Sequence, residues 1–82
     1  TTIIPFTIPD AGSGEDLFVT LDVYNLSGQR VISLMSGSIT SGQYSITWDG
    51  RNQRGHAVSS GLYFYRLEAG SFLQTRKLTL VQ

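Results

Sequence analysis

The sequence predicts an all-β domain, built as an antiparallel sandwich of short strands. Side chains that favour strands are abundant, since 28 of the 82 residues are Val, Ile, Thr, Phe, Tyr or Trp. Apolar and polar residues alternate along several segments, most clearly between Glu15 and Asn25. Helix formers are scarce, because one lysine, two glutamates and three alanines leave no long stretch with a helical apolar stripe.

Length and composition limit the classes of protein to which the chain can belong. At 82 residues and 9.0 kDa, residues 1–82 form a single domain. The 40% hydrophobic content and the balance of six basic against six acidic residues exclude a disordered chain and a strongly basic nucleic-acid binder. No apolar run approaches the roughly 18 residues of a membrane-spanning helix, and the N-terminus lacks the charged start of a secretory signal. Without cysteine, disulfides and thiolate metal sites are excluded.

The first half of the chain reads as four strands. Ile4, Phe6 and Ile8 share one face, and Pro5 between them lacks a hydrogen-bond donor, which predicts an edge strand. A glycine-containing loop is expected at residues 10–14 and a half-buried strand at residues 15–25. A hairpin turn follows, in which Gly28 takes a positive φ and Asn25 bonds to nearby backbone. Strands are then predicted at residues 30–35 and 44–48, with a loop at residues 36–43.

The second half reads as a long polar loop followed by a hairpin. Residues 49–55 are turn-rich, with Asp49 capping backbone N–H groups, and Ala57 and Val58 form at most a very short strand. Residues 62–68 and 72–81 must pair as antiparallel strands, because only three residues separate them. Six to seven strands of this kind predict an immunoglobulin-like antiparallel β-sandwich, and the edge proline argues against a closed barrel.

Several side chains define the expected core. Trp48 is its natural centre, and Tyr63 occupies the place of the tyrosine corner that many sandwich domains carry on a late strand. The full set of residues expected in the core is Ile4, Phe6, Val19, Leu21, Val23, Val31, Tyr44, Ile46, Trp48, Val58, Tyr63, Tyr65, Leu67, Leu78 and Leu80.

Residue patterns for catalysis or metal binding are weak. His56 is the single histidine and cannot alone form a zinc site or a catalytic triad. Asp16 and Asp22 share a strand face but lie roughly 20 Å apart at ~3.3 Å per residue, too far for a glycosidase pair. The segment starting at Asp49 has Arg51 at a ligand position of a calcium loop, so a structural turn is favoured. We expect a non-catalytic domain without a cofactor or metal.

Exposed aromatic and basic side chains leave two interpretations open. Four aromatic residues fall opposite the core stripe of their strands or at a turn, namely Phe18, Tyr24, Phe64 and Phe72. They form either ordinary rim packing or an exposed apolar patch of the kind that marks a partner site. Arg66, Arg76 and Lys77 form either a small basic patch or a strand edge protected by charge.

Several segments together resemble a known family. They are residues 47–52, Gly55, residues 58–70 and residues 75–78. The combination of a Trp-Asp-Gly-Arg turn, a Gly-x-Tyr strand and a terminal Lys-Leu pair resembles the C-terminal sorting domain of type IX secretion substrates. That family is related to the immunoglobulin-like domain of the flagellar hook-capping protein. The resemblance extends through residues 23–31 to residues 1–3, and so covers essentially the whole chain.

The resemblance implies a role in protein export. Such domains end a larger secreted protein, often a hydrolase, and direct it across the outer membrane of a Gram-negative bacterium, from the periplasm to the medium or the cell surface. The expected partners are the secretion machinery and an attached N-terminal cargo, with no nucleic acid and no membrane insertion. The family's Asn-Pro-Phe-Asn-Pro segment would precede Thr1, so we expect a fragment of a longer cargo. Two residues depart from the family. Pro5 stands where a non-proline strand residue is more usual, and Gln82 stands where relatives often have a basic residue.

The final hairpin is the candidate export signal. It places two cations beside an apolar residue on an exposed rim, and the candidate receptor contact is therefore Arg76, Lys77 and Leu78. A carbohydrate-binding or adhesive module of a secreted hydrolase is the alternative function, because exposed aromatic rings stack on sugars. An assembly module like the hook-capping domain is a third.

Overall fold

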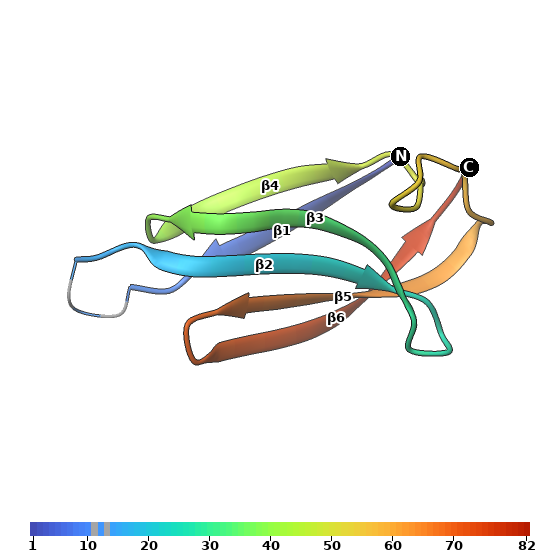
Figure 1. Ribbon diagram of the computed structural model, residues 1–82. Helices are drawn as coiled ribbons and strands as arrows, with labels where there is room; N and C mark the ends of the chain where they lie inside the picture. The colour runs from blue at the N-terminus through green and yellow to red at the C-terminus, as the bar shows by residue number, and fades with distance from the viewer. Residues whose placement is uncertain (11, 13) are drawn as a thin grey trace.

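The chain folds into strands joined by turns and loops (Figure 1). The computed structural model describes residues 1–10, 12 and 14–82. Over these residues there is no helix, and hence none long and apolar enough to cross a membrane. The strands of the described residues are β1 (Thr2–Ile8), β2 (Leu17–Tyr24), β3 (Arg30–Ile39), β4 (Gly42–Trp48), β5 (Gly61–Ala69) and β6 (Phe72–Leu80).

The strands form two antiparallel sheets that pack as the layers of a sandwich. One sheet has β1 paired with β4, and the other has the order β3-β2-β5-β6. The predicted immunoglobulin-like antiparallel β-sandwich is confirmed, and Pro5 does lie in an edge strand, since β1 pairs with β4 alone. Figure 1 shows the N- and C-termini at the same end of the molecule.

Alternation of side chains along the strands builds the core between the sheets. Val19, Leu21 and Val23 of β2 are fully buried, and their β5 register partners Ala69, Leu67 and Tyr65 are buried with them. The two-stranded sheet contributes further side chains from the opposite side, namely Ile4, Phe6, Ile8 and Trp48. Tyr63 and Leu80 complete the core.

The predicted core differs from the observed core at a few positions. Ile8 and Ala69 are buried although neither was expected in the core, and Tyr44 is 36% exposed although it was. Tyr44 lies at the margin of the two-stranded sheet, which is too narrow to cover all of the four-stranded one. Four other expected core residues are only partly buried and pack against the core, namely Val31, Ile46, Val58 and Leu78.

The loop predicted at residues 36–43 is wrong. The β3 strand continues through Ile39 and β4 begins at Gly42, so only Thr40 and Ser41 lie between them. Glycine and serine in this segment suggested a turn, but Gly37 pairs with Val19 and Gly42 with Ile8. Ladder hydrogen bonds need no side chain, and pairing therefore overrides the weak strand preference of these residues.

The turns around β2 follow the predictions. Gly28 has a φ of 83°, and Asn25 Oδ1 accepts hydrogen bonds from the backbone N–H groups of Ser27 and Gln29, each at 3.0 Å. Before β2, Gly12 N–H donates to Asp10 Oδ1 at 2.8 Å. The predicted loop at residues 10–14 includes Ala11 and Ser13, which lie outside the described residues.

Candidate functional site

The β5–β6 hairpin carries the three candidate receptor-contact residues. A two-residue turn, Gly70 and Ser71, joins its strands. Arg76 pairs with Tyr65, Lys77 with Phe64 and Leu78 with Tyr63. Arg76 and Lys77 are exposed, whereas Leu78 is partly buried against the core.

Strand alternation separates the two cations of the hairpin. Tyr65 points into the core, so its partner Arg76 lies on the inner face, the face that meets the β1–β4 sheet. Lys77 lies with Phe64 on the outer face. A single basic patch of Arg66, Arg76 and Lys77, one of the two interpretations of these side chains, is therefore divided between two faces. The Arg66 Nη2 atom also forms an ion pair with Glu68 Oε1 at 3.1 Å.

A groove of about 550 Å³ opens on the inner face beside Arg76. It lies where β6 and the β1–β4 sheet diverge, and the Phe6 and Tyr44 rings stack in its wall with centroids 5.6 Å apart. When the Gln74 side-chain amide is oriented with its oxygen toward Arg76, this oxygen accepts hydrogen bonds from Arg76 Nε at 3.1 Å and Nη2 at 2.9 Å. The lining residues are Pro5, Phe6, Thr7, Gln43, Tyr44, Tyr65, Phe72, Gln74 and Arg76.

The Trp-Asp-Gly-Arg segment forms an ordered turn at the opposite end of the sandwich. The Trp48 ring meets Tyr63 edge to face at a centroid distance of 5.1 Å, and its Nε1–H donates to the Arg51 carbonyl at 2.9 Å.

Asp49 Oδ1 accepts a hydrogen bond from Arg51 N–H at 3.2 Å, as the predicted cap requires. Asn52 Oδ1 accepts from the backbone N–H groups of Arg54 and His56, each at 3.0 Å. These polar groups stabilise the turn itself.

Two glutamines fasten this loop to the rest of the fold. Gln53 N–H donates to the Val31 carbonyl and Gln53 Oε1 accepts from Ser33 N–H, both at 3.1 Å, so the loop covers part of the β3 edge. The Gln82 side-chain amide donates to the carbonyls of Gly50 at 2.9 Å and Val58 at 2.7 Å. The end of β6 is thereby tied to the loop.

A hydrogen bond from Tyr63 holds the segment that immediately precedes β5. Its hydroxyl donates to the Ser59 carbonyl at 2.7 Å, four residues upstream, which is the contact of a tyrosine corner. The sequence-predicted corner is thus confirmed.

The sequence model of one family, the FlgD Ig-like domain, matches residues 11–71, which is more than half of the chain. The chain belongs to the FlgD Ig-like domain family. In this FlgD Ig-like domain the matched segment contains β2, β3, β4 and β5, while β1 and β6 lie outside it. No curated protein and no solved structure matches the chain significantly.

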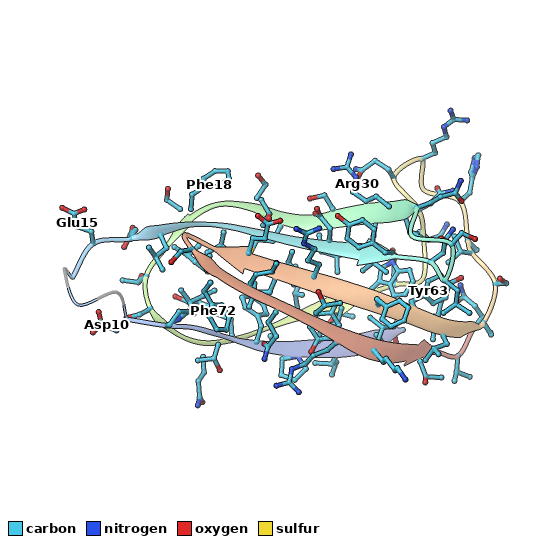
Figure 2. All side chains as sticks on the ribbon, turned by 90° about the horizontal axis from the view of Figure 1, so that it is seen from below. Asp10, Glu15, Phe18, Arg30, Tyr63 and Phe72 are labelled. Atoms are coloured by element: carbon cyan, nitrogen blue, oxygen red, sulfur yellow. The ribbon has the colours of Figure 1, made fainter. Side chains whose placement is uncertain are left out.

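The aromatic residues of this FlgD Ig-like domain do not form one patch. Phe18, Tyr24 and Phe64 lie on the outer face, with Phe18 60% exposed and the other two half-buried. Phe72 is 38% exposed and lines the groove on the inner face. Figure 2 shows Phe18 and Phe72 toward the end that holds Asp10 and Glu15, with Tyr63 and Arg30 toward the other end.

The acidic residues of the domain are dispersed. Asp22 faces Ser33 and Arg66 in the sheet register, and its Oδ1 atom is buried without a hydrogen-bond partner. Among the described residues, no three His, Asp or Glu side chains gather closely enough to hold a metal ion. His56 lies exposed in the loop after Asn52, as expected.

Sequence reasoning missed the groove as a site. Its β6 residues Phe72, Gln74 and Arg76 have the spacing of one strand face, which the sequence alone reveals. The contributions of Pro5 and Tyr44 come from the other sheet. How the two sheets sit against each other is a tertiary property that no local pattern carries.

Proposed function

We propose that the domain is a non-catalytic C-terminal sorting module, which directs an attached cargo protein across the outer membrane and to the cell surface. The observation that carries this proposal is the resemblance to type IX sorting domains at residues 1–3 and 75–78, outside the segment matched by the FlgD Ig-like domain. The immunoglobulin-like fold also supports the proposal, because type IX sorting domains are related to the immunoglobulin-like domain of the flagellar hook-capping protein.

The physical properties of the domain suit such a role. A sandwich without cysteine folds in the periplasm independently of disulfide formation. The terminal hairpin presents Arg76 and Lys77 to solvent on its two faces, so a receptor of the secretion machinery has charged features to bind. The remaining proposed partner is the N-terminal cargo, for which a secreted hydrolase is our candidate.

An export assay with single variants tests the proposal. Residues 1–82, preceded by the family's upstream segment, are fused to the C-terminus of a periplasmic reporter in a bacterium with type IX secretion. We expect the reporter at the cell surface. Arg76→Gln and Lys77→Gln are compared separately, because the two side chains lie on opposite faces. Arg54→Gln removes an exposed cation from the distant loop and is the matched control.

The export rates test two claims separately: that the domain directs export, and that the hairpin cations are recognised. We expect reduced export for at least one hairpin variant, with unchanged folding, since surface substitutions alter stability by no more than about 0.5 kcal/mol. If both variants are exported at the parental rate, the recognition surface lies elsewhere on the domain. A folded parent fusion that stays in the periplasm would refute the sorting function itself.

A sugar-binding or adhesive module remains the second candidate function. The rings of Trp48, Tyr63 and Tyr65, which could stack on a sugar if they were exposed, are all buried. Burial removes the ring faces that would stack on a pyranose, so the sorting role is the better supported of the two.

A further inference from the structure

The β6 strand has an open edge on the side away from β5, because β6 is the last strand of its sheet. Thr2 Oγ1 donates to the Thr79 carbonyl at 3.4 Å, so this carbonyl points away from β5 and toward β1. Backbone groups alternate in direction along a strand. The N–H and C=O groups of Leu73, Thr75 and Lys77 therefore point outward as well. The two-residue turn agrees, because the flanking pair Ala69 and Phe72 bond each other in such hairpins.

Within the described part of the chain, no residue bonds to these outward groups, whereas the other edge of the same sheet is covered in part. On β3, Gln53 bonds to Val31 and Ser33. Between the described residues, no such bond engages Leu73, Thr75 or Lys77. An uncovered edge of this kind is a template for another strand.

The groove continues this edge on the inner face. The exposed parts of Phe72 and Tyr44 offer apolar contact there, and Arg76 adds a positive charge. The ion pairs between described residues are Arg51–Asp49 and Arg66–Glu68, so Arg76 has the Gln74 amide as its neighbour and no carboxylate. No residue of β6 is acidic, whereas Arg76 and Lys77 are both basic.

We propose that the β6 edge and the adjoining groove bind an extended acidic peptide segment of a partner protein as an additional strand. The peptide backbone pairs with Leu73, Thr75 and Lys77, and alternate side chains enter the groove. One of these is an Asp or Glu whose carboxylate binds Arg76, since a guanidinium and a carboxylate form a strong charge-assisted pair. This mode of binding supplies affinity through the main chain and specificity through alternate side chains.

The positive charge of β6 favours an acidic peptide over a second copy of the chain as the added strand. Two β6 edges joined together would bring Arg76 and Lys77 of both copies into one small region, and like charges across strands are destabilising. An acidic peptide has the complementary charge. The proposal goes beyond the sorting function and holds whether or not the domain acts in export.

A proline variant isolates the backbone contribution. The Thr75 N–H points away from β5, so Thr75→Pro removes an outward donor while the β5–β6 ladder keeps its bonds, and proline is tolerated at such edge positions. Thr75→Val keeps the donor and is the matched control. Arg76→Gln and Arg76→Glu test the charge in the groove. Far-UV circular dichroism verifies that each variant is folded.

The probe is a displayed library of random ten-residue peptides. It is selected on the wild-type chain and counter-selected on Thr75→Pro. We expect enriched peptides to alternate apolar residues with others and to contain Asp or Glu. In fluorescence polarisation, binding should weaken about tenfold in Arg76→Gln, more in Arg76→Glu, and remain unchanged in Thr75→Val.

Amide exchange on the wild-type chain gives a second readout that does not depend on any variant folding. Adding an enriched peptide should slow exchange at the amides of Leu73, Thr75 and Lys77. Unchanged exchange at all three would overturn the proposal. So would a library without enrichment over Thr75→Pro, or enriched peptides that bind Arg76→Gln with full affinity.

Discussion

Trp48 joins the two sheets through one side chain. It extends from β4 in the two-stranded sheet, and its ring meets Tyr63 of β5 in the four-stranded sheet edge to face. Its indole nitrogen also bonds the Arg51 carbonyl, so the same residue supports the loop after β4. A fully buried aromatic ring in a domain of this size contributes a large share of the apolar area removed from water.

Replacing Trp48 should therefore be severe. We expect Trp48→Ala to lower the free energy of unfolding by about 3–5 kcal/mol, the usual cost of a large cavity. Urea unfolding followed by circular dichroism measures it. Truncation of the 60% exposed Phe18 to alanine is the control and should cost far less. A Trp48→Ala variant as stable as the parent would contradict the packing described.

The Tyr63 hydroxyl offers a more precise comparison. Tyr63→Phe removes its bond to the Ser59 carbonyl and should cost about 0.5–1.5 kcal/mol. Tyr65→Phe is the matched control, because Tyr65 is equally buried but its hydroxyl makes no hydrogen bond to another described residue. Equal unfolding midpoints for the two variants would show that the corner bond adds nothing to stability.

Residue roles were predictable where a side chain sits inside a regular alternation. Trp48 was assigned to the core correctly because its polar neighbours Thr47 and Asp49 fixed its face, and Tyr63 because it occupies the place of a tyrosine corner. Tyr44 satisfies the same pattern yet is 36% exposed, because its position depends on how far the opposite sheet extends. Alternation identifies a face but not what covers it.

The loop between β4 and β5 behaves as a structural element, although residues 52–56 and 58–60 are neither helix nor strand. An isolated bridge pairs Arg51 with Ala57, and Val58 N–H donates to the Gly50 carbonyl at 2.9 Å. Gly50 has a φ of 78°, and a Cβ atom there would lie 2.5 Å from Gln82 Nε2. The positive φ of the turn therefore favours glycine, and a larger residue would also push the Gln82 amide out of its place.

Gln82→Ala should loosen this loop. The substitution removes the two side-chain hydrogen bonds to Gly50 and Val58, so we expect a loss of about 1–2 kcal/mol and faster exchange of the Val58 amide. Val81→Ala is the control, since Val81 is 71% exposed. Unchanged Val58 exchange in Gln82→Ala would mean that the loop holds its shape without the terminal residue.

Strand existence was easier to predict than strand ends. Each predicted long strand is present, but β3 runs beyond Met35 to Ile39 because cross-strand pairing with β2 carries it through Ser36 and Gly37. Turn chemistry was predicted well at Asn25, where a single side chain makes the decisive bonds. Local bonds can be read from the sequence, whereas ladder pairing depends on a distant strand.

At the scale of the molecule, the two sheets should fold together. At ~0.05–0.15 kcal/mol per residue we expect roughly 4–12 kcal/mol of stability and one transition. Trp48 is the single tryptophan and reports packing between the sheets, while circular dichroism reports the strands. Their urea curves should coincide. Separate midpoints would show that the β1–β4 sheet detaches before the other unfolds.

Sugar binding can be tested on the whole chain. Because the rings of Trp48, Tyr63 and Tyr65 are buried, we expect no saturable heat on titration with xylan, cellulose or mannan fragments. Tyr44→Ala changes the most exposed tyrosine and is the variant to compare if heat appears. Saturable heat that disappears in Tyr44→Ala would favour the carbohydrate-binding alternative.

Proximity of the termini has a steric consequence for any protein joined to this one. Figure 1 shows both termini at one end, with the β3–β4 and β5–β6 turns at the other, and the molecule measures 41 × 21 × 20 Å. A bulky neighbour attached through Thr1 would shield the near end. The far end, including the hairpin turn at Gly70 and the adjacent Phe72, would lie farthest from this neighbour and stay accessible to a large partner.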